Sequence, residues 1–370
     1  MYLTQGLHRG LQQYPDRIAT VSGDRRQSFA QLHDRVGRWA AVLRGLGVGV
    51  GDRVALLAPN IDAYIEFAYG CWWAGAVIVP INTRWSAAEI AFALTDSGAS
   101  VLITDGSLAG LARTAAARVP ELGGLFLLRE DPVIGMPSVE ALLQATPPVA
   151  DPRIGGDTLA AIFYTGGTTG RPKGVMLSHT NLWSAMISRL ADSPLPHAHV
   201  VLLTAPLFHI AGFGRVLVLV ILGGTGVFLP AFDAAALITT VEREQVTDLM
   251  LVPTMLDAVL SHPDFHPDRL RSVARISYGA APISEALLDR ALALLPGIGF
   301  TQAYGMTENW GVATFNPPEN HVEPTPGAGR PKLRVTGRAY GCAEIAIADP
   351  EGRPVTIGEV GRASNSCDSG

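Results

Sequence analysis

A loop rich in glycine and threonine carries the clearest chemistry in this chain. It covers 164–174, reads Tyr-Thr-Gly-Gly-Thr-Thr-Gly-Arg-Pro-Lys-Gly, and directly follows the apolar run 159–163. The apolar run predicts a buried strand, and the glycine content disfavours regular structure in the segment that follows it. Free backbone N–H groups, threonine hydroxyls and the charge of Lys173 suit a polyanion. We therefore predict that the loop binds the phosphates of a nucleoside triphosphate.

Two other interpretations exist for this loop. A Gly/Thr tract can be a flexible surface loop, but the preceding strand and the following Pro-Lys-Gly argue against that. A Walker A loop requires Gly-Lys-Ser/Thr, whereas Lys173 follows Pro172 and precedes Gly174. The spacing therefore excludes a Walker A loop.

A second loop, Tyr-Gly-Met-Thr-Glu at 304–308, follows the predicted strand 298–303. In open α/β sheets, ligands lie beyond the carboxyl ends of the strands, which is where this loop falls. Tyr304 can stack on a purine, Thr307 can bond to a phosphate, and Glu308 offers a carboxylate of the kind that Mg²⁺ takes. By itself the pentapeptide is more typical of a structural loop than of a binding site.

Two further segments end predicted strands. Small residues at 279–281 would let a flat ligand approach the backbone, although they also suit a simple strand-to-helix turn. His209 follows the Pro-Leu-Phe at 206–208, and a lone histidine among apolar residues is often a core residue. Phe213, Met306 and Trp310 are weaker candidates for the walls of a pocket, with a core role as the alternative.

Taken in their order along the chain, these segments resemble the signatures of the adenylate-forming enzymes. That family includes acyl-CoA synthetases, adenylation domains of peptide synthetases and luciferases. The one departure in the first signature is a glycine, in the pair at 166–167, where serine is usual. The resemblance implies catalytic roles for Thr165, Lys173, His209 and Glu308, and metal binding by Thr165 and Glu308. It implies nucleotide binding by Thr165, Gly166, Gly167, Thr168, Thr169, Gly170, Lys173, Gly279, Ala280, Ala281, Tyr304, Gly305 and Thr307.

The resemblance implies a reaction that uses ATP, Mg²⁺ and CoA. A carboxylic acid would first form an acyl-adenylate, and the thiol of CoA would then displace AMP. Peptide-synthetase domains usually carry an aspartate where His209 stands, to pair with an amino group. Because no acid is close in the sequence, a free ammonium would lack a partner, which favours a fatty or aryl acid over an amino acid. An adenylation domain that loads a carrier protein and a non-catalytic binder of nucleotide or acyl-adenylate are the alternatives.

Composition limits the partners of the 370-residue chain. Its net charge of −5 argues against nucleic acid, and 48% hydrophobic with 16% charged residues indicates a globular protein. Three distant cysteines, an N-terminus without a signal peptide and the glycine-broken apolar tract 216–230 predict a cytoplasmic protein without a transmembrane segment. The sequence leaves open whether the chain forms a homo-oligomer.

The fold class predicted is α/β, with two stacked, mostly parallel sheets covered by helices and a small β-rich subdomain at the C-terminal end. Expected helices are 28–46, 61–74, 86–96, 181–190, 212–222, 233–244, 254–261 and 284–295. Expected strands are 53–57, 76–79, 100–104, 159–163, 200–203, 225–229, 248–252, 274–278 and 298–303. Segments 129–158 and 311–334 are expected to be connections, and 343–357 a β-hairpin turning at 349–352.

The predicted domain covers 1–362, with subdomains of roughly 1–150, 151–330 and 331–362. Residues 363–370 are polar and without pattern, so they are expected to be a disordered tail. The family's Thr-Gly-Asp motif and small C-terminal domain, with its lysine, are not found after residue 362. We therefore expect a truncated member of the family whose activity is impaired.

Overall fold

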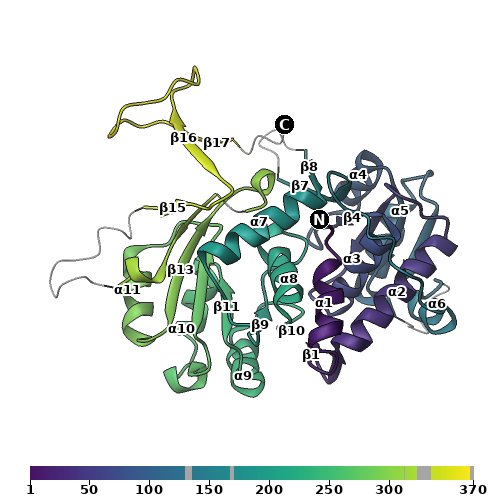
Figure 1. Cartoon of the computed structure of the whole chain (residues 1–370), viewed down its shortest axis with the longest axis horizontal. Coiled ribbons are helices and arrows are strands. Elements are labelled where there is room, and N and C mark those ends of the chain that lie inside the picture. The colour runs from purple at the N-terminus through teal and green to yellow at the C-terminus, as the bar shows by residue number, and fades with distance from the viewer. Residues whose placement is uncertain (130–135, 167–170, 312, 323–334, 367–370) are drawn as a thin grey trace.

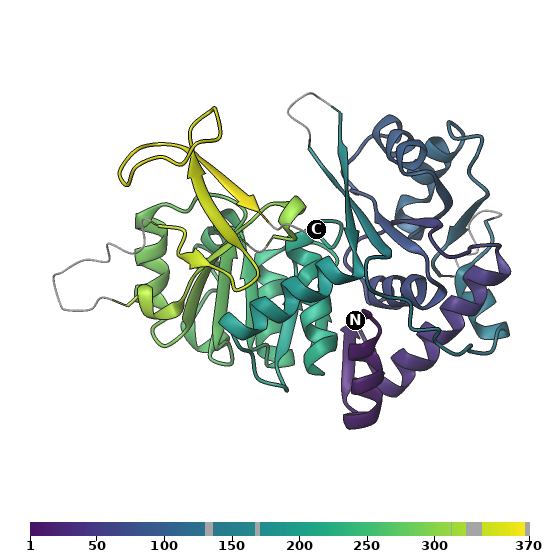
Figure 2. The same cartoon turned by 45° about the horizontal axis from the view of Figure 1, so that its top comes forward.

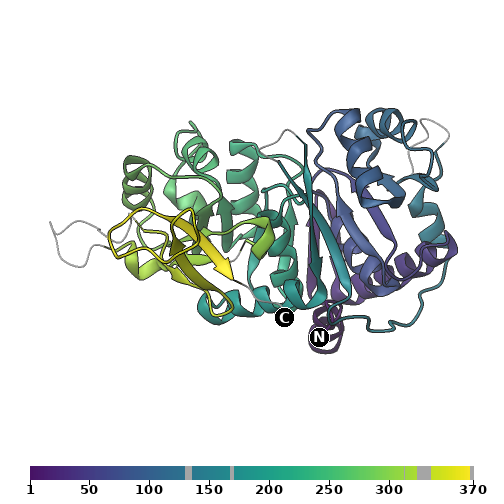
Figure 3. The ribbon, with the colours of Figure 1, turned by 90° about the horizontal axis from the view of Figure 1, so that it is seen from above.

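The computed structural model describes residues 1–129, 136–166, 171–311, 313–322 and 335–366, without the side chains of 362–366. Two large sheets covered by helices lie side by side (Figures 1 and 3), which confirms the predicted fold class. A third, two-stranded sheet, β16 with β17, projects from one half.

The first sheet has six strands in the order β6-β5-β3-β4-β7-β8. All neighbours are parallel except β7 and β8, which form an antiparallel hairpin. Both faces are apolar, because alternate residues of one strand enter different cores: Val54 and Leu56 face the middle of the molecule, while Ala55 and Leu57 face its outside. The strands are β3 (Arg53–Leu57), β4 (Val77–Pro80), β5 (Ala99–Thr104), β6 (Gly124–Leu127), β7 (Leu159–Thr165) and β8 (Lys173–Ser178).

The second sheet has nine strands in the order β15-β14-β13-β12-β11-β9-β10-β1-β2. Its central strands are parallel, and antiparallel pairs close both ends. The strands are β1 (Ile18–Ser22), β2 (Arg25–Ser28), β9 (Val200–Leu203), β10 (Thr225–Phe228), β11 (Asp248–Leu251), β12 (Arg275–Gly279), β13 (Gly299–Tyr304), β14 (Thr314–Asn316) and β15 (Arg338–Ala339).

Helices cover both sheets and fill the space between them. The helices are α1 (Gln5–Gln13), α2 (Phe29–Gly45), α3 (Ala63–Ala74), α4 (Ala87–Ser97), α5 (Ala109–Ala116), α6 (Val139–Ala145), α7 (His179–Asp192), α8 (Ile210–Leu222), α9 (Ala234–Glu244), α10 (Pro253–Leu260) and α11 (Glu285–Leu294). Short 3₁₀ turns are η1 (Gly106–Leu108), η2 (Pro267–Leu270), η3 (Thr307–Asn309) and η4 (Pro318–Asn320). Helices α9, α10 and α11 share an outer core with the nine-stranded sheet.

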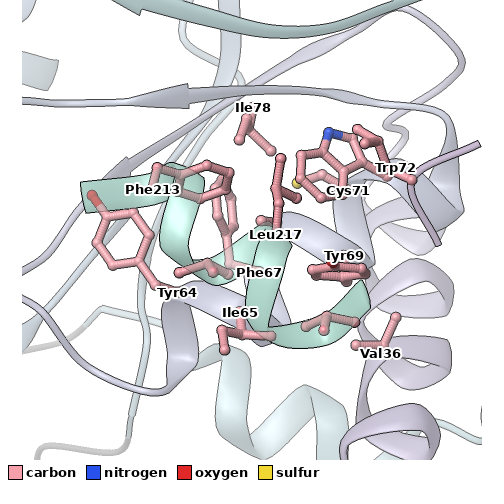
Figure 4. Close-up of a cluster of buried hydrophobic side chains, with 14 of the residues drawn as sticks. Val36, Tyr64, Ile65, Phe67, Tyr69, Cys71, Trp72, Ile78, Phe213 and Leu217 are labelled. Atoms are coloured by element: carbon pink, nitrogen blue, oxygen red, sulfur yellow. The ribbon is translucent and has the colours of Figure 1, made fainter. Parts of the chain in front are cut away.

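The middle layer joins the two halves. Every residue of α3 is buried, and Figure 4 shows its side chains meeting those of α8. The rings of Trp72 and Phe213 lie edge to face, 6.1 Å apart. Gly70 lets α2 approach α3 closely, because a Cβ at that position would overlap Trp39. The core therefore packs helix against helix between two sheets.

Sheet membership does not follow a single division of the chain near residue 150. Strands β1 and β2, at the N-terminus, belong to the nine-stranded sheet. Strands β7 and β8, which come after residue 150, belong to the six-stranded sheet. Strands from before and after residue 150 therefore occur in both sheets, so the chain passes from one half of the molecule to the other more than once.

The predicted helices and strands named above are all confirmed, with shifts of a few residues at their ends. The predicted hairpin is confirmed in part: after the turn at 349–352, Pro354 forms an antiparallel bridge with Ala348 and the Val355 N–H donates to the Ile347 carbonyl, but the strand that pairs along β16 (Glu344–Ala348) is β17 (Arg362–Ser366). Two expectations were wrong. The segment 311–334 contains β14 and η4 rather than loop alone. Residues 362–366 are a strand and not a disordered tail, because their backbone groups pair with β16 despite their polar composition.

Elements that had no sequence prediction include β8 and the helix α6 within 129–158. Strand β8 is largely exposed, so its residues lack a period-2 apolar signal. Within the described residues, no helix combines the length and the hydrophobicity needed to cross a bilayer.

The buried His179, the first residue of α7, makes stability depend on pH. Burial, followed by the charge of the N-terminal ammonium, lowers its pKa from 6.5 to about 4. Between these two pH values the His179 imidazole binds a proton in the unfolded chain but not in the folded chain. The free energy of unfolding therefore falls as the pH falls. We expect a loss of about 3 kcal/mol from this group.

Denaturant unfolding from pH 7 to pH 4 measures this effect. His179→Gln should flatten the slope of stability against pH, whereas His266→Gln, at an exposed histidine, should leave it unchanged. An unchanged slope in the His179 variant would show that other groups cause the dependence.

Candidate functional site

The glycine- and threonine-rich segment 164–174 includes the end of β7 and the start of β8, two strands that form an antiparallel hairpin (Figure 2). Thr165 ends β7 and pairs in register with Lys173, the first residue of β8. The Thr165 hydroxyl lies 3.5 Å from the Lys173 carbonyl oxygen, to which it donates, and the Lys173 side chain is exposed. Gly166 follows the strand, while Gly167, Thr168, Thr169 and Gly170 lie outside the described residues. The hairpin thus presents one lysine beside the loop.

The base of the hairpin is fixed to the first sheet's helices. The Tyr164 hydroxyl donates to Asp96 Oδ2 at 2.7 Å and to the Ala93 carbonyl at 3.1 Å, both on α4. Burial, with help from the Asp96 hydrogen bond, raises the pKa of Tyr164, which keeps the phenol a donor. A Cβ at Gly174 would come 2.9 Å from Ile162 and 3.2 Å from the Tyr164 ring. Glycine is therefore needed for this pairing of β7 and β8.

Strands β12 and β13 end side by side, which brings two predicted segments together. Gly279, the last residue of β12, pairs with Ala303, and a Cβ at Gly279 would overlap the Ala303 backbone. Ala280 has a φ of +61°, in the left-handed region that residues with a Cβ seldom occupy. Ala280 and Ala281 are both exposed. The turn therefore leaves an open backbone surface beside Tyr304.

The loop 304–308 is held by its own backbone. Gly305 packs so closely on Gly311 that a Cβ would overlap it, and the Met306 N–H donates to Asn309 Oδ1 at 2.8 Å. Tyr304 is 40% exposed. The Glu308 side chain is exposed and has no hydrogen bond or ion pair with any residue that the structure describes. The turn η3, which contains Glu308, lies next to β8, the strand that begins at Lys173.

A cavity of about 420 Å³ opens beside these loops. Of the predicted residues, His209, Ala280, Gly305 and Thr307 line it, together with Met306 and Trp310. Phe213 does not: it is fully buried behind Trp310, at 6.4 Å between ring centres. Phe213 therefore has the core role and does not form a pocket wall, because α8 turns that side chain toward α3.

His209 precedes α8 at the cavity wall. Desolvation, followed by the charge of Arg84, lowers its pKa below the usual 6.5. The imidazole is therefore mainly neutral at neutral pH, and it can accept or donate a hydrogen bond without adding a charge. It has no side-chain capping bond to the helix, which leaves it available to a ligand.

Sequence reasoning missed the inner wall of the cavity, which includes Met186 and Arg189 of α7, Arg215 of α8 and Tyr340. Arg215 is 3% exposed and forms an ion pair with the buried Asp248. One signal was present in the sequence, since Arg215 interrupts an otherwise apolar stretch from Phe213 to Leu222. A charged residue inside a buried helix requires a partner or a function.

The arrangement defines a class of protein. It combines an exposed lysine at the start of β8, an exposed carboxylate on the turn η3 that packs against that strand, and a cavity next to the ends of β12 and β13. The AMP-binding enzyme family model matches residues 7–362, and the chain belongs to this adenylate-forming family.

Several relatives are acyl-CoA ligases. The chain is 37% identical to a feruloyl-CoA synthase of an Amycolatopsis species, over 96% of this chain and 69% of the relative. It is 34% identical to the long-chain-fatty-acid–CoA ligase FadD13 of Mycobacterium tuberculosis, over 84% of this chain and 60% of the relative. The match thus spans about two thirds of the length of these relatives.

Solved structures agree on the fold. The N-terminal domain of FACL13 from M. tuberculosis, with an inhibitor bound, has a TM-score of 0.83 at 31% identity and covers 96% of this chain and 86% of its own. The anthranilate CoA ligase AuaEII, in complex with anthranoyl-AMP, has a TM-score of 0.89 at 25% identity and covers 98% of this chain and 69% of its own.

Close backbone packing at Gly305 generates a prediction. Gly305→Ala should cost about 1–3 kcal/mol of stability, because the added methyl group meets the Gly311 backbone. It should also weaken AMP binding, since the loop must shift. Thermal unfolding and calorimetry measure the two effects. Gly110→Ala is the control, because that helical glycine has open space around it and alanine there favours the helix. Equal AMP affinity in parent and Gly305 variant would contradict the close fit.

Proposed function

We propose that this chain activates a carboxylic acid with ATP to an acyl-adenylate and transfers the acyl group to CoA. The observation that carries the proposal is the packing of β8, which begins with the exposed Lys173, against η3, which carries the exposed Glu308 and whose Thr307 lines the same cavity as His209. In this proposal the ammonium of Lys173 binds the phosphates of ATP. The carboxylate of Glu308 binds a metal ion on those phosphates, and the cavity holds the acid. Membership of the AMP-binding family supports the same assignment.

Each predicted residue has a role in this proposal. Gly166, Gly167, Thr168, Thr169 and Gly170, with Thr165 and Lys173, would hold the β- and γ-phosphates through N–H groups, hydroxyls and the ammonium. Tyr304, Gly305 and Thr307 would bind the AMP part from one side, and Gly279, Ala280 and Ala281 from the other. His209 would border the reacting carboxylate.

Mg²⁺ fits the residues that are present. Glu308 has an exposed carboxylate without a partner in the described part of the chain, and Thr165 ends the neighbouring hairpin strand. Mg²⁺ on a nucleotide usually takes one or two carboxylates and keeps several waters, so one glutamate is enough. When bound, the ion would neutralise part of the phosphate charge.

The chemistry then needs position and charge neutralisation more than a covalent catalyst. A carboxylate oxygen attacks the α-phosphorus of ATP, and pyrophosphate leaves. The sulfur of CoA next attacks the acyl carbon, and AMP leaves. A neutral His209 can orient the carboxylate through a hydrogen bond without forming an ion pair that would have to break.

The acceptor thiol has a second candidate. One relative, ScoC of Streptomyces coeruleorubidus, is a fatty acid–acyl-carrier-protein ligase and is 32% identical over 95% of this chain. A carrier protein bears its thiol on the same kind of flexible arm that CoA provides. Activation by ATP is common to both proposals, and only the second half-reaction separates them.

Pyrophosphate release tests the activation step. The chain is given ATP, Mg²⁺, CoA and a panel of fatty and aryl acids, with pyrophosphate and acyl-CoA followed separately. Lys173→Ala should reduce acid-dependent pyrophosphate release, because a charge-assisted phosphate contact of about 1.5–3 kcal/mol is lost. Arg171→Ala removes a neighbouring exposed charge and is the matched control. AMP binding without pyrophosphate release from any acid would favour a non-catalytic binder.

Glu308→Gln tests the metal role, because it keeps the size of the side chain and removes its charge. The dependence of ATP binding on Mg²⁺ should weaken by about tenfold, whereas AMP binding should hardly change. Titration calorimetry with and without Mg²⁺ measures both. Full Mg²⁺ dependence in the variant would assign the metal to another carboxylate.

A further inference from the structure

The cavity reaches inward along α8, and its inner end is cationic. Arg215 follows His209 by about 9 Å along the helix axis. It pairs with Asp248, the first residue of β11, so its guanidinium lies toward the amino ends of the strands. Arg189, on the neighbouring α7, lines the same end of the cavity, and so do Met250 and Tyr340.

The positive charge at this end is not balanced. Asp248 pairs with Arg215 through one oxygen, while Arg215 Nε and Asp248 Oδ2 are both buried without a hydrogen-bond partner among the described residues. The Arg189 guanidinium has no hydrogen bond or ion pair with any described residue. Burial, followed by the charge of Arg215, lowers the pKa of Arg189 to about 10, so it still carries its charge at neutral pH. Arg275 adds to the field, although its guanidinium is bonded to Ser193 and Pro194.

We propose that Arg189 and Arg215 bind a second carboxylate at the distal end of the acid substrate. The substrate class is then a dicarboxylic acid, with one carboxylate at His209 for activation and the other at the arginines. This inference rests on the proposed function, since it assumes that the cavity holds the acid to be activated.

A carboxylate suits this site better than the other groups an acid could bring. The half-buried Arg189 guanidinium has no described anion to pair with, and a carboxylate accepts hydrogen bonds from a guanidinium in pairs while neutralising its charge. A phenolic or carbonyl oxygen would accept a hydrogen bond but leave the excess charge in place. A plain alkyl end would desolvate Arg189 without offering a hydrogen-bond acceptor or a negative charge in place of the water.

Calorimetry with the AMP-loaded chain tests the proposal. Straight-chain dicarboxylic acids of increasing length are compared with monocarboxylic acids of the same length, and a phenolic aryl acid is added as the neutral acceptor. We expect the best dicarboxylic acid to bind about tenfold to a hundredfold more tightly than its monocarboxylic counterpart.

Arg189 is the residue to change, because it has no described partner whose loss would unfold the chain. Arg189→Gln should remove the preference for the dicarboxylic acid, through weaker binding of that acid, and leave the affinity for AMP unchanged. Arg189→Lys should keep most of the preference, since it retains the charge. Arg290→Gln is the control, at an arginine of α11 that bonds to Leu260 and Ser261 away from the cavity.

The outcomes separate this inference from the function beneath it. AMP binding and acid-dependent pyrophosphate release without a dicarboxylate preference would overturn the inference alone. A preference that survives in Arg189→Gln, or tighter binding of the phenolic acid than of any dicarboxylic acid, would overturn it too. Absence of both AMP binding and pyrophosphate release would overturn the proposed function, and the inference with it.

Discussion

The structure depends on one buried carboxylate in the helix between the sheets. Glu66 is fully buried and accepts hydrogen bonds from Arg25 at 2.8 Å, Gln27 at 3.1 Å and the Trp39 indole at 3.2 Å. Arg35 pairs with it at 2.8 Å. Burial by itself would raise the pKa of Glu66, but the Arg35 hydrogen bond and the two arginine charges outweigh it, so the pKa is lowered. The charge is therefore kept inside the protein and joins β2, α2 and α3.

This anchor matters because α3 has no exposed face to orient it. A helix that is apolar on every side can rotate or slide in a core, whereas a fixed carboxylate allows one register. The register of α3 in turn sets α8, whose Phe213 packs on Trp72, and α8 carries both His209 and Arg215 to the cavity. The six-stranded sheet on the other side of α3 carries Lys173. The distance between the phosphate loop and the acid cavity is thus controlled by the core and not by the loops.

The site contains two kinds of groups that could contact a ligand, namely exposed backbone groups and charged side chains. Glycines at 279 and 305 let strands and turns approach each other so closely that no side chain fits, which leaves backbone groups exposed beside Tyr304. Charged side chains supplement the backbone: Lys173 and Glu308 are exposed on β8 and η3, and Arg189 and Arg215 line the cavity. Folds of this kind host several acids and acceptors, so substrate choice must come from such local groups rather than from the architecture.

The sequence by itself determined the local structure and the outer part of the site. The alternation of apolar strands and helices, the Ser86–Glu89 capping box and the signature residues Thr165, Lys173, Tyr304 and Glu308 are all visible within short windows, because periodicity, capping and loop chemistry act over a few residues.

Only the tertiary structure decided the rest. Strand β8 is too exposed to show a pattern, β17 is a strand because β16 lies beside it, and Arg189 meets Arg215 only because α7 and α8 pack together. The burial of α3 and the pairing of Glu66 with arginines on two other elements likewise join residues far apart in the chain. Such contacts leave no local signal, since the sequence spacing of the partners is set by the path of the chain and not by the interaction itself.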